Sequence, residues 1–242
     1  MYNLEQFKKD LAFFEIDLSE KQIDQFMIYY ELLVEWNSFM NLTAITEFDE
    51  VMKKHFIDSL SLVKAYERIR NDEIEVIDIG TGAGFPGIPL KIAFPQIKIT
   101  LLDSLQKRIK FLGEVTERLE LRNIEFIHGR AEDFAKQNGK REKFDLCVSR
   151  AVANLSTLSE LCLPYVKVGG DFISYKSEKI AEEAAVAEYA IKLLGGRIKE
   201  QKDFILPDSD IYRNLFIIEK VRNTPVRFPR KAGTPAKEPL SK

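Results

Sequence analysis

The stretch VIDIGTGAGFPG, residues 76–87, decides the fold of this chain of 242 residues. Its first four residues are mostly apolar, as in a central parallel strand that is buried on both faces. Three alternating glycines follow, and glycine allows both a positive φ and a close approach of the backbone to a neighbouring group. Apolar residues resume at Ile88. The stretch therefore predicts a buried strand, a tight glycine turn and a helix.

Two classes of ligand suit such a turn. Residues 82–87 spell GxGxxG, but a dinucleotide site needs free backbone amides at the helix N-terminus, and Pro86 has no amide hydrogen. The second frame consists of Asp78, Gly80, Gly82 and Gly84. It places a carboxylate at the strand tip, which suits the ammonium of S-adenosylmethionine (AdoMet) better than a pyrophosphate. AdoMet is the favoured cofactor, and a nicotinamide dinucleotide remains the alternative.

A second acidic residue supports a nucleoside ligand. The segment KITLLDS, residues 98–104, resembles a buried strand and ends with Asp103 and Ser104. An acid about 20 residues after the glycines can accept hydrogen bonds from both ribose hydroxyls. Two alternatives need no ligand: the glycines form only a tight strand-to-helix turn, and Asp103 only caps the helix that starts near Leu105.

Length and composition fit a folded enzyme. Hydrophobic residues make up 45% of the chain, enough for one substantial core and a smaller accessory unit. Charged residues begin at Glu5, and no apolar run approaches a membrane span, so we expect a cytoplasmic protein without membrane association. Cys147 and Cys162 are expected in the core rather than in a disulfide. Because His55 and His128 are the only histidines, we expect no metal site.

The net charge of −2 conceals a basic C-terminus. Residues 220–242 carry seven Lys or Arg side chains and one acidic side chain, an asymmetry that suggests a polyanionic partner. The segment is rich in proline and poor in apolar residues, which argues against a packed element. A solvated, partly disordered end without a partner is the alternative.

The chain divides into three segments. Residues 1–70 show helical spacing of apolar residues and predict an N-terminal helical cap. Its helices are expected to start at a capping box formed by Ser19 and Gln22, and near Thr46 or Asp49. Residues 71–222 alternate between strand and helix patterns, which predicts an α/β fold with a mostly parallel sheet. The basic Pro-rich tail is residues 223–242.

The expected strands lie near residues 75–80, 98–104, 124–129, 144–150, 171–176, 197–205 and 213–221. A turn with Pro207 and two aspartates separates the last two, which predicts an antiparallel hairpin at one edge of the sheet. Such an ending is unlike a dinucleotide domain.

Motifs along nearly the whole chain resemble the RsmG family, also named GidB. They are WNSFMNLTAI (36–45), HFIDSL (55–60), DIGTGAGFPGIPLKI (78–92), LLDSLQKRIKFL (101–112), GRAED (129–133), VSRAVA (148–153) and RFPRKAGTPAKEPL (227–240). The resemblance implies a class I AdoMet-dependent methyltransferase with a Rossmann-like fold. It implies methylation of N7 of one guanine in the 530 loop of 16S rRNA. The expected partner is 16S rRNA or the small ribosomal subunit, including an assembly intermediate, and we expect a monomer.

The resemblance also implies contacts to AdoMet from Gly80, Phe85, Asp103, Ala131, Glu132 and Arg150. The strand tips add Asp78, Gly82, Gly84 and Ser104 as expected cofactor-binding residues. For Arg150 an internal salt bridge remains an alternative. Contacts to RNA are expected from Lys176, Arg227, Arg230 and Lys231, although Lys176 is equally consistent with an ordinary surface lysine. His55 and Trp36 lie in amphipathic patterns and are expected to hold the cap onto the sheet.

The residues agree with N7 as the methyl acceptor. Methylation of a pyrimidine ring carbon requires a cysteine nucleophile on an exposed loop, and neither cysteine is so placed. The segment 149–152 after the fourth strand reads SRAV, which lacks both the pattern typical of adenine amino methylation and an acid for a ribose hydroxyl. Guanine N7 has a free lone pair, so we expect no catalytic acid or base and catalysis by orientation, with Phe85 assisting by a cation–π interaction. The rivals are an NAD(P)-dependent oxidoreductase and a non-catalytic ribosome-assembly factor.

Overall fold

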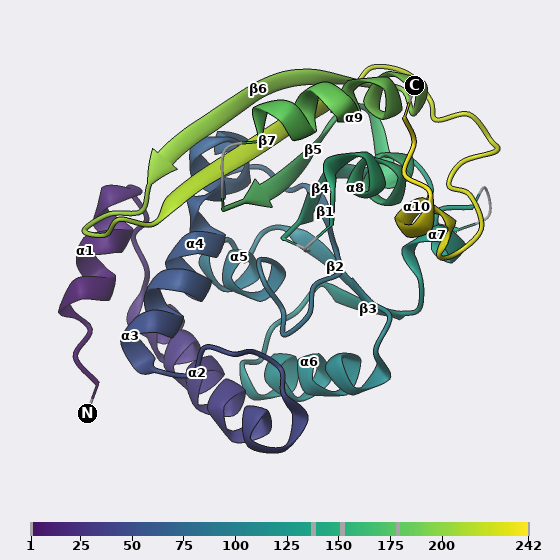
Figure 1. Cartoon of the computed structure of the whole chain (residues 1–242). Coiled ribbons are helices and arrows are strands. Elements are labelled where there is room, and N and C mark those ends of the chain that lie inside the picture. Colours follow the sequence, from purple (N-terminus) through teal and green to yellow (C-terminus); the bar gives the residue numbers. More distant parts are fainter. Residues whose placement is uncertain (1, 137–138, 151–152, 178–179, 242) are drawn as a thin grey trace.

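The computed structural model of the chain describes residues 2–136, 139–150, 153–177 and 180–241. Its centre is a seven-stranded sheet in the order β3-β2-β1-β4-β5-β7-β6 (Figure 1). The strands are β1 (Glu75–Ile79), β2 (Lys98–Asp103), β3 (Ile124–His128), β4 (Phe144–Ser149), β5 (Val166–Lys176), β6 (Gly196–Ile205) and β7 (Tyr212–Lys220). Strands β1 to β5 are parallel, and β7 runs antiparallel between β5 and β6. This confirms the α/β architecture and the edge hairpin.

One strand begins earlier than expected. β5 starts at Val166 instead of residue 171. Its first part pairs with β4 through Phe144↔Val166, and the register then shifts before the pair Leu146↔Asp171. Gly169 and Gly170 lie in this irregular part, and glycines inside a strand often mark a bulge. These glycines interrupt the apolar pattern of the strand, so the pattern predicts only its second part, from residue 171.

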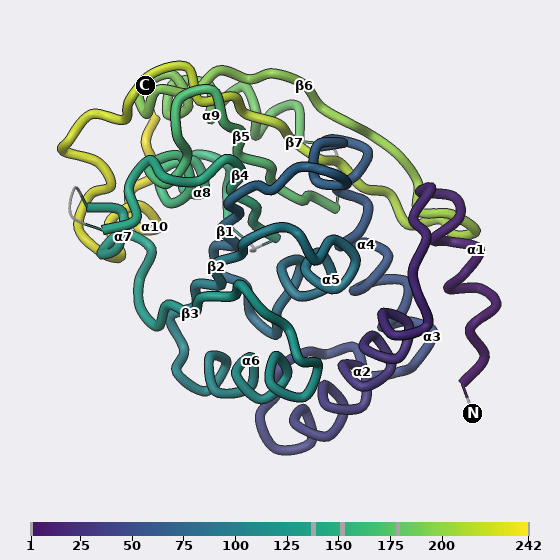
Figure 2. The backbone as a smooth tube through the Cα atoms, turned by 180° about the vertical axis from the view of Figure 1, so that it is seen from behind, coloured from purple at the N-terminus to yellow at the C-terminus, as the bar shows by residue number. Residues whose placement is uncertain are grey.

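Helices cover both faces of the sheet (Figures 1 and 2). They are α1 (Glu5–Phe13), α2 (Glu20–Met40), α3 (Phe48–Val51), α4 (Asp58–Leu60), α5 (Gly87–Ala93), α6 (Gln106–Arg118), α7 (Ala131–Phe134), α8 (Leu155–Cys162), α9 (Ala181–Leu193) and α10 (Thr234–Lys237). The helices up to α6 pack around one apolar core of the sheet, and α7, α8 and α9 pack around a second core on the other face. Cys147 and Cys162 are both free and buried in the second core, as expected. Within the described ranges, no helix is long and apolar enough to cross a membrane.

The N-terminal segment that we call the cap contains α1 to α4. Ser19 and Gln22 make the expected capping box at the start of α2. The next helix begins at Phe48 without a side-chain cap and continues through a π-helical segment, Met52–Ile57. The cap shares its apolar core with the sheet, so it packs as part of one unit.

The glycine turn joins β1 to α5 at the carboxyl end of the sheet. Gly80, Gly82 and Gly84 have φ values of 73°, 62° and 100°, which glycine adopts without steric cost. The backbone amides of Gly80 and Thr81 donate to the carbonyl oxygen of Leu102 in β2, at 2.9 and 3.1 Å. The turn is therefore fixed to the neighbouring strand.

Asp78 lies beneath the turn and not at its rim. Its side chain is fully buried, and Oδ2 accepts hydrogen bonds from the Thr81 hydroxyl at 2.7 Å and the Gly87 amide at 2.9 Å. Burial raises the pKa of Asp78 to about 7, although these two hydrogen bonds act in the opposite direction. The expected contact with the AdoMet ammonium does not fit this position. Asp78 instead fixes the start of α5 to β1.

Gly84 is the point where the cap contacts the turn. A Cβ atom here would lie 2.7 Å from Tyr29 Oη and from Ile88 Cγ1, and 2.9 Å from Leu112 Cδ2. Tyr29 is fully buried in α2, and its hydroxyl donates to the carbonyl oxygen of Ala83 at 2.5 Å. The glycine at this position therefore allows the turn to pack closely against the cap.

Replacing Gly84 by alanine should destabilise the fold more than replacing Gly82. Both positions have positive φ, so each alanine is strained by about 1–2 kcal/mol. Gly82→Ala meets nothing within 4 Å, whereas Gly84→Ala also crowds Tyr29 and Leu112, which adds about 1–3 kcal/mol. Urea denaturation of the two variants measures the difference in the free energy of unfolding. Equal losses would show that the contact with the cap is not tight.

Candidate active site

A first cavity, of about 580 Å³, opens beside the glycine turn. It lies at the carboxyl ends of β1, β2 and β4, the usual position for a ligand in an open parallel sheet. Eight residues expected to bind the cofactor line it: Gly80, Gly82, Phe85, Asp103, Ser104, Ala131, Glu132 and Arg150. Asp78 beneath the turn and Gly84 within it are not part of the lining. The structure thus gathers residues from four separate motifs around one cavity.

Asp103 is held in place by three donors. Oδ2 accepts from the Gly82 amide at 2.9 Å and from Arg108 at 3.1 Å, and Oδ1 accepts from the Leu105 amide at 2.9 Å. A carboxylate has about four acceptor sites, so it keeps room for a ligand hydroxyl. Asp103 is not the N-cap of α6, because Leu105 holds that position and α6 has no side-chain cap, but Asp103 does accept from the Leu105 amide just before the helix.

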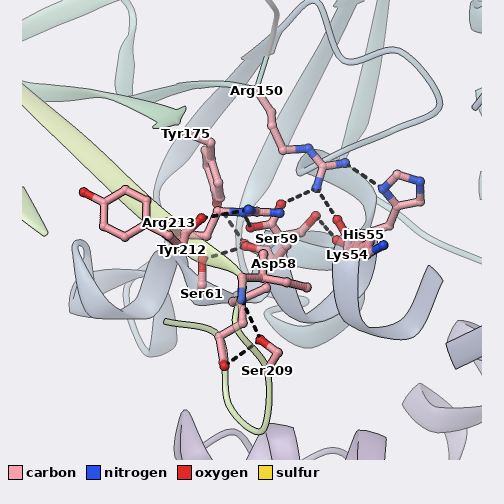
Figure 3. A network of polar contacts seen from close by, with 12 residues as sticks. Lys54, His55, Asp58, Ser59, Ser61, Arg150, Tyr175, Ser209, Tyr212 and Arg213 are labelled. Carbon is pink, nitrogen blue, oxygen red and sulfur yellow. Dashed lines mark hydrogen bonds and ion pairs between the residues drawn. The ribbon is translucent and has the colours of Figure 1, made fainter. Parts of the chain in front are cut away.

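A buried acidic side chain binds two arginines near the carboxyl end of β4 (Figure 3). Asp58 is 2% exposed. Its Oδ2 accepts from Arg150 Nη1 at 2.8 Å, and its Oδ1 accepts from Arg213 Nε at 2.5 Å. The internal salt bridge considered for Arg150 is thus present. Because one carboxylate holds two guanidinium groups, the cluster keeps a net positive charge.

His55 belongs to the same cluster and was missed as a site residue. Arg150 can only donate, so the 3.3 Å contact makes His55 Nδ1 the acceptor, and Nε2–H then donates to Thr43 Oγ1 at 2.9 Å. Burial, with Arg150 as a second cause, lowers the pKa of His55 to about 3. Its ring stacks on Phe85 with centroids 4.4 Å apart. The signal was the three-residue spacing of His55 and Asp58, which places both on one side of a helix.

Trp36 behaves as expected. It packs partly buried against the cap-side core, with ring centroids 5.5 Å from Phe39 and 5.6 Å from Phe111. It lines neither of the cavities at the strand tips.

A second cavity, of about 570 Å³, adjoins the first. The two share His55, Arg150 and Ala153 in their linings. The second cavity is lined by more basic than acidic side chains: Lys54, Arg150, Lys176 and Arg213 against Asp58 and Glu183. Lys176 donates to Glu183 and to the carbonyl oxygen of Ala153, at 2.8 and 2.9 Å, and only 12% of its side chain is exposed. It is a wall residue of this cavity.

The basic tail is folded, contrary to the expectation from its composition. Phe228 and Pro235 are buried, and Arg230 pairs with Glu160, whose side chain is fully buried. This pairing gives Arg230 a structural partner in place of the expected RNA phosphate. Arg227 and Lys231 are exposed, and neither forms an ion pair with a described residue.

The described ranges contain no group of three or more His, Cys, Asp or Glu side chains placed to hold a metal ion. Ala151 and Val152, which follow Arg150 in the SRAV segment, lie outside the described residues.

Similar proteins of known structure share the fold. The structure of M. jannaschii TYW2 in complex with AdoMet superposes with a TM-score of 0.52 at 16% identity, over 68% of this chain and 77% of that one. A mutant of MtNAS superposes with a TM-score of 0.55 at 16% identity, over 84% of this chain and 75% of that one. At this identity the likeness concerns the fold alone.

Sequence comparison gives the family. The model of rRNA small subunit methyltransferase G matches residues 22–211. A ribosomal RNA small subunit methyltransferase G of Lachnoclostridium phytofermentans is 59% identical over 93% of this chain and 92% of its own length. The protein of the same description from Bacillus cereus is 52% identical over 99% of this chain and 100% of its own length. These matches confirm the resemblance inferred from the motifs: the chain belongs to the rRNA small subunit methyltransferase G family, also named RsmG or GidB.

Proposed function

We propose that this chain transfers a methyl group from AdoMet to N7 of a guanine in the 530 loop of small-subunit rRNA. The observation that carries the proposal is the meeting of two cavities at His55, Arg150 and Ala153. The first is lined by the glycine turn and Asp103, and the second by basic side chains. We call these three residues the shared wall, and a donor and an acceptor bound in the two cavities would meet beside it.

The first cavity suits AdoMet. Gly82 leaves open space above the turn, since a Cβ there would meet nothing within 4 Å. The carboxylate of Asp103 is fixed at the wall and can accept a ribose hydroxyl. Phe85 presents an aromatic side chain, of which one face is already stacked on His55. When bound, AdoMet supplies an electrophilic methyl group on a positively charged sulfur.

The second cavity suits the acceptor nucleotide. Lys54, Lys176 and Arg213 each have a carboxylate partner, but the lining as a whole has more basic than acidic side chains, and this positive charge attracts phosphate. An arginine that binds guanine O6 and N7 would occupy the lone pair that must attack. Arg150 avoids this conflict, because Asp58, His55 and the carbonyl oxygen of Lys54 already accept from its guanidinium.

The side chains at the shared wall support transfer without a general base. Both ring nitrogens of His55 are engaged, and its low pKa makes it a poor proton acceptor at neutral pH. N7 attacks with its own lone pair, the bond from methyl to sulfur breaks, and no proton moves. The protein contributes by fixing both partners at attack distance, an effect that amounts to roughly 7–11 kcal/mol in favourable cases.

The family does not support the oxidoreductase alternative. The intact glycine turn and Asp103 argue against a non-catalytic assembly factor. One chain supplies the lining of both cavities, which supports our proposal that the enzyme acts on 16S rRNA or a small-subunit particle as a monomer.

The acceptor can be identified directly. Small-subunit rRNA from cells that lack the protein, incubated with the enzyme and AdoMet, should break at one guanine after borohydride and aniline treatment, which reports N7 methylation. Cys147→Ala and Cys162→Ala should both retain transfer, because neither buried thiol can reach a substrate. Methyl label recovered on a pyrimidine or a ribose would overturn the proposal.

The cofactor site predicts a specific loss in Asp103→Asn. This variant keeps the size of the side chain but removes the charge that accepts from the ligand, so the affinity for AdoMet should fall by about 1.5–3 kcal/mol, roughly tenfold to a hundredfold. Calorimetric titration measures this. Asp133→Asn on α7, where the side chain is exposed beside Lys136, is the matched control and should bind normally. Equal affinities, or tight binding of NAD, would refute the assignment.

Two exposed cations of the tail, Arg227 and Lys231, should contact RNA. Replacing Arg227 and Lys231 by alanine should reduce the slope of log affinity against log salt by about 0.7 for each lost phosphate contact on single-stranded RNA. Filter binding across a salt series measures the slope. Lys8→Ala with Lys9→Ala on α1 removes the same charge far from the tail (Figure 1). If both double variants behave like the unmodified protein, the tail cations have no role in RNA binding.

A further inference from the structure

The C-terminal segment, residues 224–240, lies against α7 and α8 (Figures 1 and 2). Its root is fixed by Arg141, which donates to the carbonyl oxygens of Thr224 and Phe228 at 2.5 and 2.8 Å. Phe228 inserts into the second core, where it is 5% exposed. The segment is therefore anchored before it reaches the strand tips.

A buried ion pair holds the middle of this segment. Glu160 of α8 is 0% exposed. Its Oε1 accepts from the Arg230 amide and Nε at 2.8 and 2.9 Å, and its Oε2 accepts from Nη2 at 2.7 Å. A buried carboxylate that loses its partner is strongly destabilising. Arg230 also donates to the carbonyl oxygen of Glu238 at 2.7 Å, so the pair fixes the path of the chain between residues 230 and 238.

The next residues reach the first cavity. The Gly233 amide donates to Glu132 Oε1 at 2.8 Å, and the Thr157 hydroxyl donates to the carbonyl oxygen of Pro235 at 2.9 Å. Gly233, Pro235 and Ala236 line the same cavity as Gly82 and Asp103. Glu132 is thus shared between the cavity wall and the tail.

We propose that residues 233–236 are a wall of the AdoMet site, and that Arg230 and Glu160 are positioning residues that keep this wall in place. The inference rests on the proposed function, in that it takes the first cavity as the AdoMet site. It revises the view of residues 223–242 as a separate tail, because the segment that carries Arg227 and Lys231 also completes the cofactor cavity.

The test is AdoMet binding by the full chain in the absence of RNA. In Arg230→Gln the wall should be docked in only a fraction of molecules, and the apparent Kd rises in inverse proportion to that fraction. We expect a rise of about tenfold, with partial rescue in Arg230→Lys. Lys237→Gln is the matched control, since it removes a positive charge from an exposed position of the same segment, and its Kd should be unchanged. An unchanged Kd in Arg230→Gln, with only a lower Tm, would reduce the pair to a structural role and overturn the proposal.

A second variant keeps the test decisive if Arg230→Gln does not fold. Ala236 is exposed at the rim of the cavity, so Ala236→Trp leaves the ion pair intact and fills the space beside the wall. It should weaken binding of both AdoMet and its demethylated product by at least about tenfold, while the unliganded Tm stays constant. Unaltered affinity would show that residues 233–236 do not border the ligand. If the enzyme does not methylate N7, the AdoMet affinities of these two variants keep their meaning. The role of residues 233–236 and the identity of the methyl acceptor are therefore tested separately.

Discussion

The buried carboxylate of Asp58 is the interaction on which both cavities depend. It comes from the cap, and it binds Arg150 at the end of β4 and Arg213 in β7. A buried charge is tolerated only when it is well paired, so the cap cannot move away from the strand tips without a large loss of stability. Through Arg150 the same carboxylate fixes His55 and, by stacking, the face of Phe85. Three regions distant in sequence are therefore held in one geometry.

That geometry supports our proposal that methyl transfer needs no acid or base. The charged and titratable side chains at the shared wall are bonded to one another, with Asp58 on two arginines, His55 between Arg150 and Thr43, and Lys176 on Glu183. None has to change its protonation state for a lone pair to attack a methyl group. Groups that are preorganised in this way keep their positions when substrate binds, and preorganisation is the main contribution available to such a reaction.

Much of the fold was predictable because local sequence patterns specify it. Apolar runs marked the strands, and the glycine spacing marked the turn. Asp78 shows where local pattern fails. It pairs in register with Leu101 and Val148, and both of these side chains belong to the cap-side core. Alternation along β1 therefore points Asp78 under α5 and away from the ligand. The position of Asp78 near the end of a strand predicted that it lies close to the first cavity, but not the direction in which its side chain points.

The packing of the tail and the role of His55 were missed for a different reason. The partner of Arg230 is Glu160, which lies 70 residues earlier in the sequence. The composition of the tail does not show which distant acidic side chain its arginine will pair with. Likewise the role of His55 depends on Arg150, 95 residues away. Residues whose function is set by one long-range charged contact are the ones that single-sequence reasoning assigns to packing or to solvent.

The shared position of the tail has a thermodynamic consequence. If RNA binds Arg227 and Lys231 more tightly when the segment is docked than when it is not, it stabilises the arrangement that lines the proposed AdoMet cavity, and each ligand then raises the affinity for the other by an identical factor. The enzyme would then hold its methyl donor more tightly on the ribosomal substrate than in free solution, and would release the spent cofactor more readily once the RNA has left.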